Sequence, residues 1–201
     1  AKISEMHKNK ELPIEAMPYV IILEPEKLWG NLQEAEKEGK VEEMISVLSN
    51  MKAIWSLKEP RVDFFRNSGC LDKLLQLAAQ DSIAEMQIAS LSIIKILMKN
   101  VDFFHLFLEY PGSLPLFCSL LSVDNEEAFN IDVSILESVF NDKEGRAKLR
   151  EFDVINGILE ICSKCADEIE NPERRAPIQA LTKILSLVLI NQEEFPANVI
   201  Q

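Results

Sequence analysis

The chain has 201 residues, 47% of them hydrophobic, only 6 glycines and a net charge of −12 at pH 7. Few glycines and many aliphatic residues favour an all-α fold over an all-β one. The sequence has no apolar run of the roughly 18 residues that a membrane-spanning helix needs. Most of the negative charge lies in residues 101–201, which disfavours nucleic-acid binding because phosphate affinity comes from clustered Lys and Arg. An acidic surface can attract a basic protein or peptide, or it can serve solubility alone.

Three prolines divide the first part of the chain: Pro13, Pro18 and Pro25. Proline at this density prevents a continuous helix, because it lacks a backbone N–H and restricts the residue before it. The apolar run 19–23 is interpreted either as an extended segment lying on the first helices or as part of a linker. Residues 1–27 are therefore predicted to be an N-terminal segment or linker.

Residues 28–59 carry apolar side chains at helical spacing in two stretches. The first helix is expected to begin near Pro25 and to end at Gly39. The second is expected over residues 41–57, before Pro60, which cannot continue a helix. This pair of helices is interpreted as a diverged leading repeat.

A short motif occurs twice in the next part of the chain. Val62-Asp63-Phe64-Phe65 is repeated about forty residues later as Val101-Asp102-Phe103-Phe104. Each copy is succeeded by a glycine turn, and a degenerate copy of the segment that contains this turn lies at residues 153–159. A period near forty residues in a helical sequence predicts a stacked helical solenoid.

Residues 60–201 are expected to form three repeats, at about 60–100, 101–141 and 142–191, with a further element starting in 192–201. In each repeat a short opening helix or turn and a medium helix precede a long helix. After an opening turn at 62–65, the expected helices are 71–79 and 83–99 in the first repeat, 103–110, 114–121 and 126–140 in the second, and 145–152, 155–166 and 176–190 in the third.

Asparagine recurs at the end of each long helix, as Asn100, Asn141 and Asn191. This residue tolerates the left-handed backbone conformation in which many helices end. The three asparagines are therefore expected to be C-terminal caps.

The order of short helix, glycine turn, medium helix, short break and long helix resembles the armadillo repeat. The resemblance covers about residues 60–191, roughly two-thirds of the chain. The family's glycine before the second helix corresponds to Gly69 and Gly112, and the third repeat has Asp153 at this position.

The long helices are also similar to those of the armadillo family. The Ala-x-Leu-like start of the long-helix core corresponds to Ala89-Ser90-Leu91 and Ala180-Leu181, and the second repeat has Asn130-Ile131. The resemblance implies an all-α, right-handed helical solenoid of about three to four repeats. The related HEAT fold, with two helices per repeat, is the structural alternative.

In armadillo arrays the long third helices line a concave groove, so the resemblance implies that their solvent-facing polar residues contact a partner. The candidates are Gln87, Ser92, Lys95 and Lys99 of the first long helix, Ser134, Glu137 and Asn141 of the second, and Gln179, Thr182, Lys183 and Ser186 of the third. The alternative is that they form only the polar stripe of any exposed helix face. Importin-α-type receptors hold peptides with regular asparagines, which Ser92, Val133 and Lys183 replace here, so nuclear-signal binding by that mechanism is not expected.

The sequence offers no clear motif for catalysis or for a metal or cofactor. Cys162 and Cys165 have CxxC spacing, but zinc needs four ligands. The other candidate ligands do not form a second pair: Cys70, Cys118, His7 and His105. No glycine-rich phosphate loop occurs, and His105 lies among phenylalanines, as a packed histidine does. The chain is therefore expected to be no enzyme and to need no cofactor, and buried free thiols favour the cytoplasm or nucleus.

These features predict a non-enzymatic protein–protein interaction module, a scaffold or adaptor that binds a protein or peptide, with basic flanks as one expectation. Three alternatives remain open. The chain could resemble the inhibitory armadillo domain of diaphanous-type formins, which regulates its own protein. It could resemble the armadillo exchange factors of heat-shock chaperones. It could also be a structural piece that assembles with further copies of itself into a homo-oligomer.

Overall fold

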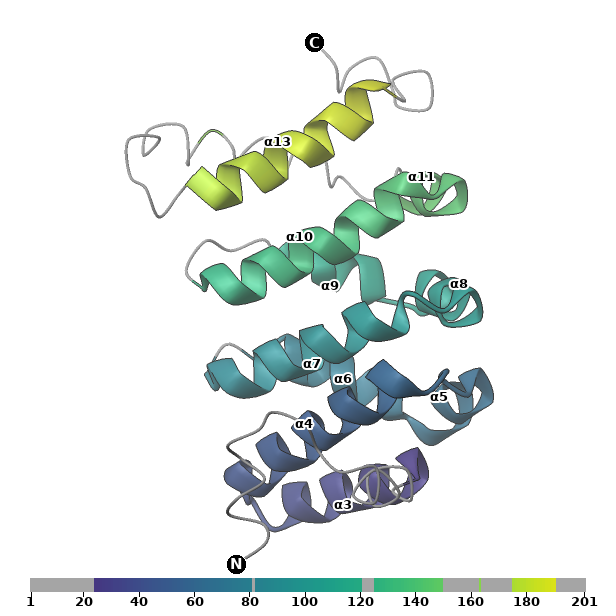
Figure 1. Ribbon diagram of the computed structural model, residues 1–201, viewed down its shortest axis with the longest axis vertical. Coiled ribbons are helices and arrows are strands. Elements are labelled where there is room, and N and C mark those ends of the chain that lie inside the picture. The colour runs from purple at the N-terminus through teal and green to yellow at the C-terminus, as the bar shows by residue number, and fades with distance from the viewer. Residues whose placement is uncertain (1–23, 81, 121–124, 150–162, 164–174, 191–201) are drawn as a thin grey trace, which may run out of the picture. The chain divides into compact units, whose positions relative to one another are not determined.

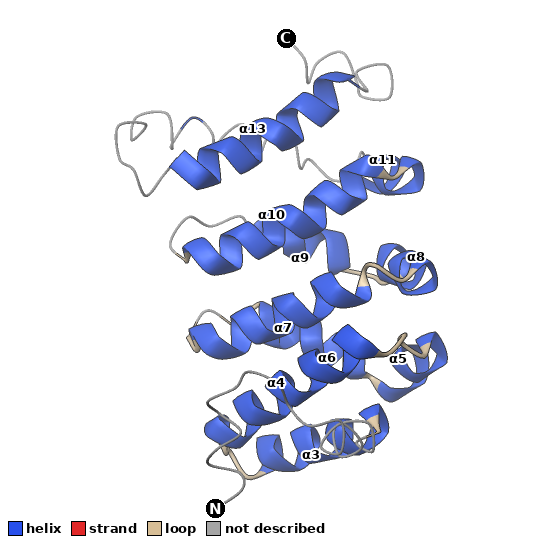
Figure 2. Ribbon diagram, viewed as in Figure 1, coloured by secondary structure: helices blue, strands red, loops and turns tan. Residues whose placement is uncertain are grey.

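The computed structural model describes residues 24–80, 82–120, 125–149, 163 and 175–190. Every regular element in these residues is an α-helix (Figure 2), which confirms the predicted all-α fold. The chain divides into two compact units, Ala1–Glu59 and Pro60–Gln201. Several predicted features lie outside the described residues: segment 1–23, all of helix 155–166 except Ser163, the two cysteines of the CxxC spacing, Asn191 and element 192–201.

The first unit contains a pair of helices, α3 (Pro25–Lys37) and α4 (Val41–Leu57), where the sequence predicts them. Gly39 has a positive φ of 67° and ends α3, since its left-handed conformation suits glycine best. The two helices contact each other. Each buries an apolar stripe, which includes Leu28, Leu32 and Ala35 of α3 and Met44, Leu48, Met51, Ile54 and Trp55 of α4.

The second unit contains eight helices in its described residues (Figure 1). They form two complete sets of three, each ending in a long helix, and the described part of a third set. The predicted order of short, medium and long helices holds in the first set, with 7, 9 and 14 residues, but not in the second, with 9, 7 and 16 residues. These helices are α5 (Val62–Ser68), α6 (Cys70–Ala78), α7 (Ala84–Leu97), α8 (Val101–Glu109), α9 (Ser113–Ser119), α10 (Glu126–Asn141), α11 (Lys143–Leu149) and α13 (Arg175–Ile190).

In both complete sets a glycine makes the turn from the first helix to the second. Gly69, between α5 and α6, has φ of 73°, and Gly112, before α9, has φ of 88°. Residues other than glycine rarely adopt this left-handed backbone conformation. The two glycines lie at the same position in the repeat, and each allows the backbone to turn between two helices.

The long helices of the second unit pack in chain order. Helix α7 contacts α10, and α10 contacts α13, while α5 contacts α8 (Figure 1). One phenylalanine from each copy of the repeated motif lies at the α5–α8 contact, where Phe65 and Phe103 meet edge to face with ring centroids 5.0 Å apart. Both side chains are buried, at 3% and 0% exposure. The repeated motif thus supplies apolar core contacts between successive sets of helices.

Asn100 does not end a helix in the predicted left-handed conformation. It has φ of −87° and ψ of 126°, and its side chain accepts a hydrogen bond from the Phe103 backbone N–H at 3.0 Å. It is therefore the N-cap of α8, a position for which asparagine is well suited. The C-cap prediction for Asn100 was wrong because α8 begins at the next residue, so Asn100 caps the start of α8 and not the end of α7.

The junction between α10 and α11 is tight. The Asp142 side chain accepts a hydrogen bond from the Gly145 N–H at 2.9 Å, and the Arg146 guanidinium donates to the Phe140 carbonyl at 2.9 Å. The Cα of Gly145 lies so close to Val139 that a Cβ at this position would overlap the Val139 carbonyl oxygen. Glycine here permits α11 to pack against the end of α10.

Candidate functional site

The candidate site is the exposed surface of the three long helices in the second unit. We call this surface the long-helix face, and nine of the residues predicted to contact a partner lie on or beside it: Lys95 of α7, Lys99 just after the end of α7, Ser134, Glu137 and Asn141 of α10, and Gln179, Thr182, Lys183 and Ser186 of α13. Seven of them are exposed, and Ser134 and Glu137 are half-buried. Their spacing of three or four residues within each helix keeps them on one side of it.

Two of the predicted contacts are not solvent-facing. Gln87 and Ser92 of α7 are each only 8% exposed. The Gln87 side-chain amide donates a hydrogen bond to the Ala78 carbonyl at 3.1 Å, which ties α7 to the end of α6. Both were predicted to face solvent, and the error has a physical cause: α7 contacts α6 and α10 and therefore has a narrower free surface than an isolated helix.

Lys183 and Glu137 bring two of the long helices together at the surface. The Lys183 ammonium of α13 lies 2.6 Å from the Glu137 carboxylate of α10. The Lys183 side chain is 63% exposed and that of Glu137 is 27% exposed. The pair lies in a partly solvated place, so it contributes modestly to stability, and each charge is largely satisfied by the other.

The hydroxyl group of Ser186 is engaged within its own helix. It donates a hydrogen bond to the Thr182 backbone carbonyl at 2.8 Å. On α10, the Ser138 hydroxyl donates in the same way to the Ser134 carbonyl at 3.0 Å. Such bonds are local to the helix, so the Ser186 hydroxyl can reach a partner only as an acceptor or after it gives up this bond.

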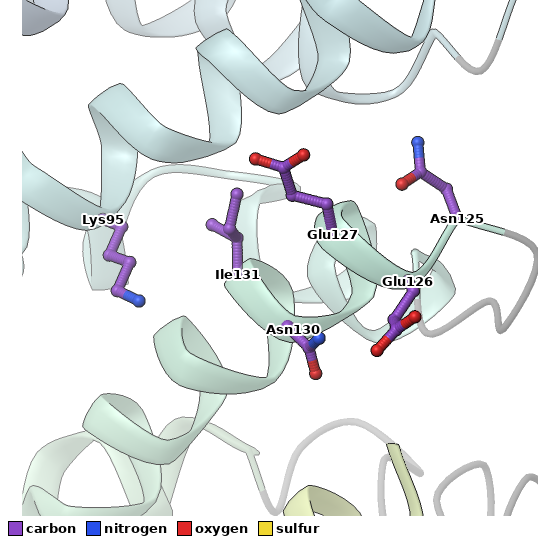
Figure 3. A pocket seen from close by; sticks show the side chains of 6 residues that line it. All are labelled: Lys95, Asn125, Glu126, Glu127, Asn130 and Ile131. Atoms are coloured by element: carbon purple, nitrogen blue, oxygen red, sulfur yellow. The ribbon is translucent and has the colours of Figure 1, made fainter. Parts of the chain in front are cut away.

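An open depression lies between α7 and α10, and we call it the α7–α10 depression. It has a volume of about 640 Å³ and is lined by Lys95 of α7 and by Asn125, Glu126, Glu127, Asn130 and Ile131 at the start of α10. Figure 3 shows Lys95 across from Ile131 and Glu127, which stand next to each other on adjacent turns of α10. Asn125 is the N-cap of α10, and its side chain accepts a hydrogen bond from the Ala128 N–H at 3.1 Å.

Sequence reasoning included Lys95 among the contacts but missed the five residues at the start of α10 that line this depression. The sequence did carry a signal, because Asn125 before two glutamates is typical of a helix start. Glu127, Ile131 and Ser134 also succeed one another at helical spacing. Nothing in the sequence indicated that Lys95 lies beside this helix start, since that depends on how α7 packs against α10.

A smaller depression lies in the first unit, with a volume of about 400 Å³. Its charged lining consists of Glu34, Glu38, Lys40 and Glu43. The Lys40 ammonium bridges Glu38 at 2.7 Å and Glu43 at 3.1 Å, and hydrogen bonds to these carboxylates raise the lysine pKa. The bridging lysine therefore balances much of the acidic charge in this place.

The second unit contains buried ionisable groups that favour their neutral forms. Asp132 of α10 is fully buried, and neither of its carboxylate oxygens has a hydrogen-bond partner. Burial without a partner raises its pKa well above the ordinary range. Burial, and secondarily the charge of Asp132, raises the pKa of the Cys118 thiol to about 12, and burial also raises the pKa of Cys70. These two thiols stay protonated at neutral pH and are poor nucleophiles and metal ligands.

Within the part of the chain that the structure describes, no group of three or more His, Cys, Asp or Glu side chains is arranged to hold a metal ion. In the same residues, no helix is long and apolar enough to cross a membrane. No family model, no curated protein and no solved structure matches this chain. The function is therefore inferred from the chain's own residues.

Proposed function

We propose that the chain is a non-enzymatic protein-interaction module that binds a segment of a partner protein along the long-helix face. The observation that supports this most is the consecutive packing of α7, α10 and α13, with exposed polar side chains on all three helices. The face offers ammonium, carboxylate, amide and hydroxyl groups along several helices. Such an extended and chemically mixed surface suits a protein segment, because protein interfaces combine many polar contacts with a few apolar anchors.

The proposal includes an armadillo-like architecture, a right-handed solenoid of three to four repeats. It is supported by the matching plans of α5–α6–α7 and α8–α9–α10, by the left-handed glycines Gly69 and Gly112 at the same place in both, and by the chain-order packing of the long helices. Repeat arrays present extended binding surfaces because each repeat contacts mainly its neighbours.

The partner in this proposal is a protein or peptide, and the compartment is the cytoplasm or nucleus. Cys70 and Cys118 are free cysteines, which is the usual state of thiols in a reducing compartment. The net charge of −12 favours a partner with basic residues near its binding segment, since complementary charge speeds association and aids specificity.

The proposal is tested by affinity capture from lysate with the chain and two double variants of equal charge change. The face variant carries Glu126→Lys and Glu127→Lys, both exposed at the start of α10 on the long-helix face, where added positive charge repels a basic segment. The control variant carries Asp63→Lys and Glu109→Lys, which are exposed on α5 and α8. All three proteins are compared by circular dichroism to verify equal helix content and melting.

The expected result is a partner that the unmodified chain and the control variant retain and that the face variant loses by about tenfold or more. Recovery of the same partner with both variants would place its site away from the start of α10. A chain that recovers only its own copies would favour the self-assembly alternative.

A further inference from the structure

The long-helix face has two junctions, one between α7 and α10 and one between α10 and α13, and only one of them has an ion pair. At the α10–α13 junction, Lys183 and Glu137 pair with each other at 2.6 Å. At the α7–α10 junction, no residue in the described parts of the chain forms an ion pair with Lys95, Glu126 or Glu127. The α7–α10 depression therefore has charged groups on both of its walls that are available to a partner.

The chemistry of the depression is amphipathic. Glu127 and Ile131 are four residues apart on α10, so their side chains neighbour each other on one side of the helix (Figure 3). Ile131 is half-buried and offers an apolar surface, and Asn130 adds an exposed amide. Lys95 stands on the opposite wall, on α7. A ligand that fits must place an apolar group beside a charged one.

The charges favour a basic ligand. The lining has two exposed carboxylates, those of Glu126 and Glu127, against a single ammonium, that of Lys95, and the chain as a whole has a net charge of −12. The two carboxylates point to opposite sides of the start of α10 (Figure 3). An arginine or lysine side chain can make charge-assisted hydrogen bonds to these carboxylates. The ammonium of Lys95 repels a cation on the α7 wall, so the basic group is directed toward the start of α10.

We propose that the α7–α10 depression is the main docking site of the partner, and that the docking segment carries an arginine or lysine next to an apolar residue. The apolar side chain packs on Ile131, the basic side chain contacts the neighbouring Glu127, and Glu126 adds negative charge at the same helix start. This inference rests on the proposed function, because it names the part of the long-helix face that binds and the chemistry of the segment that it binds.

The test selects ligands from a phage-displayed library of random dodecapeptides against the whole chain. The enriched peptides are then synthesised with a fluorescent label, and their dissociation constants are measured by anisotropy. The site variant is Glu126→Gln with Glu127→Gln, and the apolar contact is tested with Ile131→Ala. The matched control is Glu42→Gln with Asp102→Asn, which removes two exposed carboxylates from the first turns of α4 and α8.

The control matters because carboxylates in a helix's first turn also interact with the helix dipole. Both double variants remove the same charge from the same kind of position, so only a local contact separates them. The expected result is a consensus with Arg or Lys beside an apolar residue. The dissociation constant should rise about five- to tenfold in the site variant and in Ile131→Ala, and stay within about twofold in the control.

An acidic or purely polar consensus would overturn the inference, as would equal weakening by the site and control variants. A different outcome is a set of peptides whose dissociation constant rises in Thr182→Ala and Gln179→Ala of α13 and not in the site variant. That result would support the proposed function but overturn this inference, because the docking site would lie on α13. A library that yields no binder would contradict the inference together with the proposed function.

Discussion

The Lys183 ammonium of α13 lies 2.6 Å from the Glu137 carboxylate of α10, so two residues far apart in the sequence form a direct link between consecutive long helices. Both residues were proposed from the sequence as partner contacts. In the structure they contact each other, and a partner that uses either of them must compete with this ion pair.

The first prediction concerns the strength of this link. A double-mutant cycle with Lys183→Gln and Glu137→Gln should give a coupling of about 0.5–1 kcal/mol in the free energy of unfolding, because the pair is well formed but partly solvated. The coupling should shrink in about 1 M NaCl, where exposed charges are screened. Urea denaturation monitored by circular dichroism measures it, and additive single effects at low salt would contradict the link.

The second prediction concerns the buried carboxyl group of Asp132. Because burial raises its pKa in the folded chain, the folded state holds a proton that the unfolded state releases above its ordinary pKa of about 3.9. The contribution of this group to stability is fully present below that pH and is lost as the pH rises toward the folded-state pKa, by about 1.4 kcal/mol per pH unit.

Replacement of this group by Asp132→Asn should therefore raise the free energy of unfolding at about pH 7.5 and flatten its decline between about pH 5 and 7.5. At about pH 4 the variant and the unmodified chain should differ little. The control is Glu109→Gln, which replaces an exposed carboxylate. The free energy of unfolding of this variant should decline with pH as it does in the unmodified chain. An unchanged pH profile in Asp132→Asn would mean that a partner satisfies the carboxylate in solution.

The third prediction concerns the close approach of α11 to α10. Gly145→Ala should lower the free energy of unfolding by about 1–3 kcal/mol, because the added methyl group would overlap the Val139 carbonyl. Gly30→Ala on α3 is the contrasting variant, since nothing lies within 4 Å of its Cβ position, and it should be neutral or slightly stabilising. Chemical denaturation distinguishes the two, and a neutral Gly145→Ala would contradict the tight packing.

The fourth prediction concerns the helix cap that was assigned to the wrong helix. Asn100→Ala should cost about 0.5–2 kcal/mol, because it removes the acceptor of the Phe103 N–H. Asn100→Asp should retain most of the stability, since aspartate caps helices equally well. Thermal and urea unfolding measure both variants, and equal losses in the two would indicate that the side chain does not act as an N-cap.

Local sequence signals were sufficient for most helices of this chain. Helix α4 has the predicted bounds because Gly39 and Pro60 flank it and its apolar residues keep a helical period. The glycine turns at Gly69 and Gly112 were also evident, because a left-handed turn leaves few other choices of residue. These features depend on neighbouring residues alone.

The errors concern features that depend on packing between helices. Gln87 was expected to face solvent, but α7 is apolar around most of its surface, so its pattern did not show which side would face α6. The cap role of Asn100 depends on where α8 begins. The α7–α10 depression combines Lys95 with the start of α10, and no sequence pattern shows that these residues lie side by side.

Binding of a partner to the long-helix face can be followed by an isoleucine-methyl NMR titration of the chain with the captured partner. Ile131 lies half-buried in the α7–α10 depression, and Ile45 lies half-buried on α4 in the first unit. The Ile131 methyl resonance is expected to shift with partner concentration, and the Ile45 resonance is expected to stay unchanged. A shift confined to Ile45, with Ile131 unaffected at saturation, would contradict binding to the long-helix face.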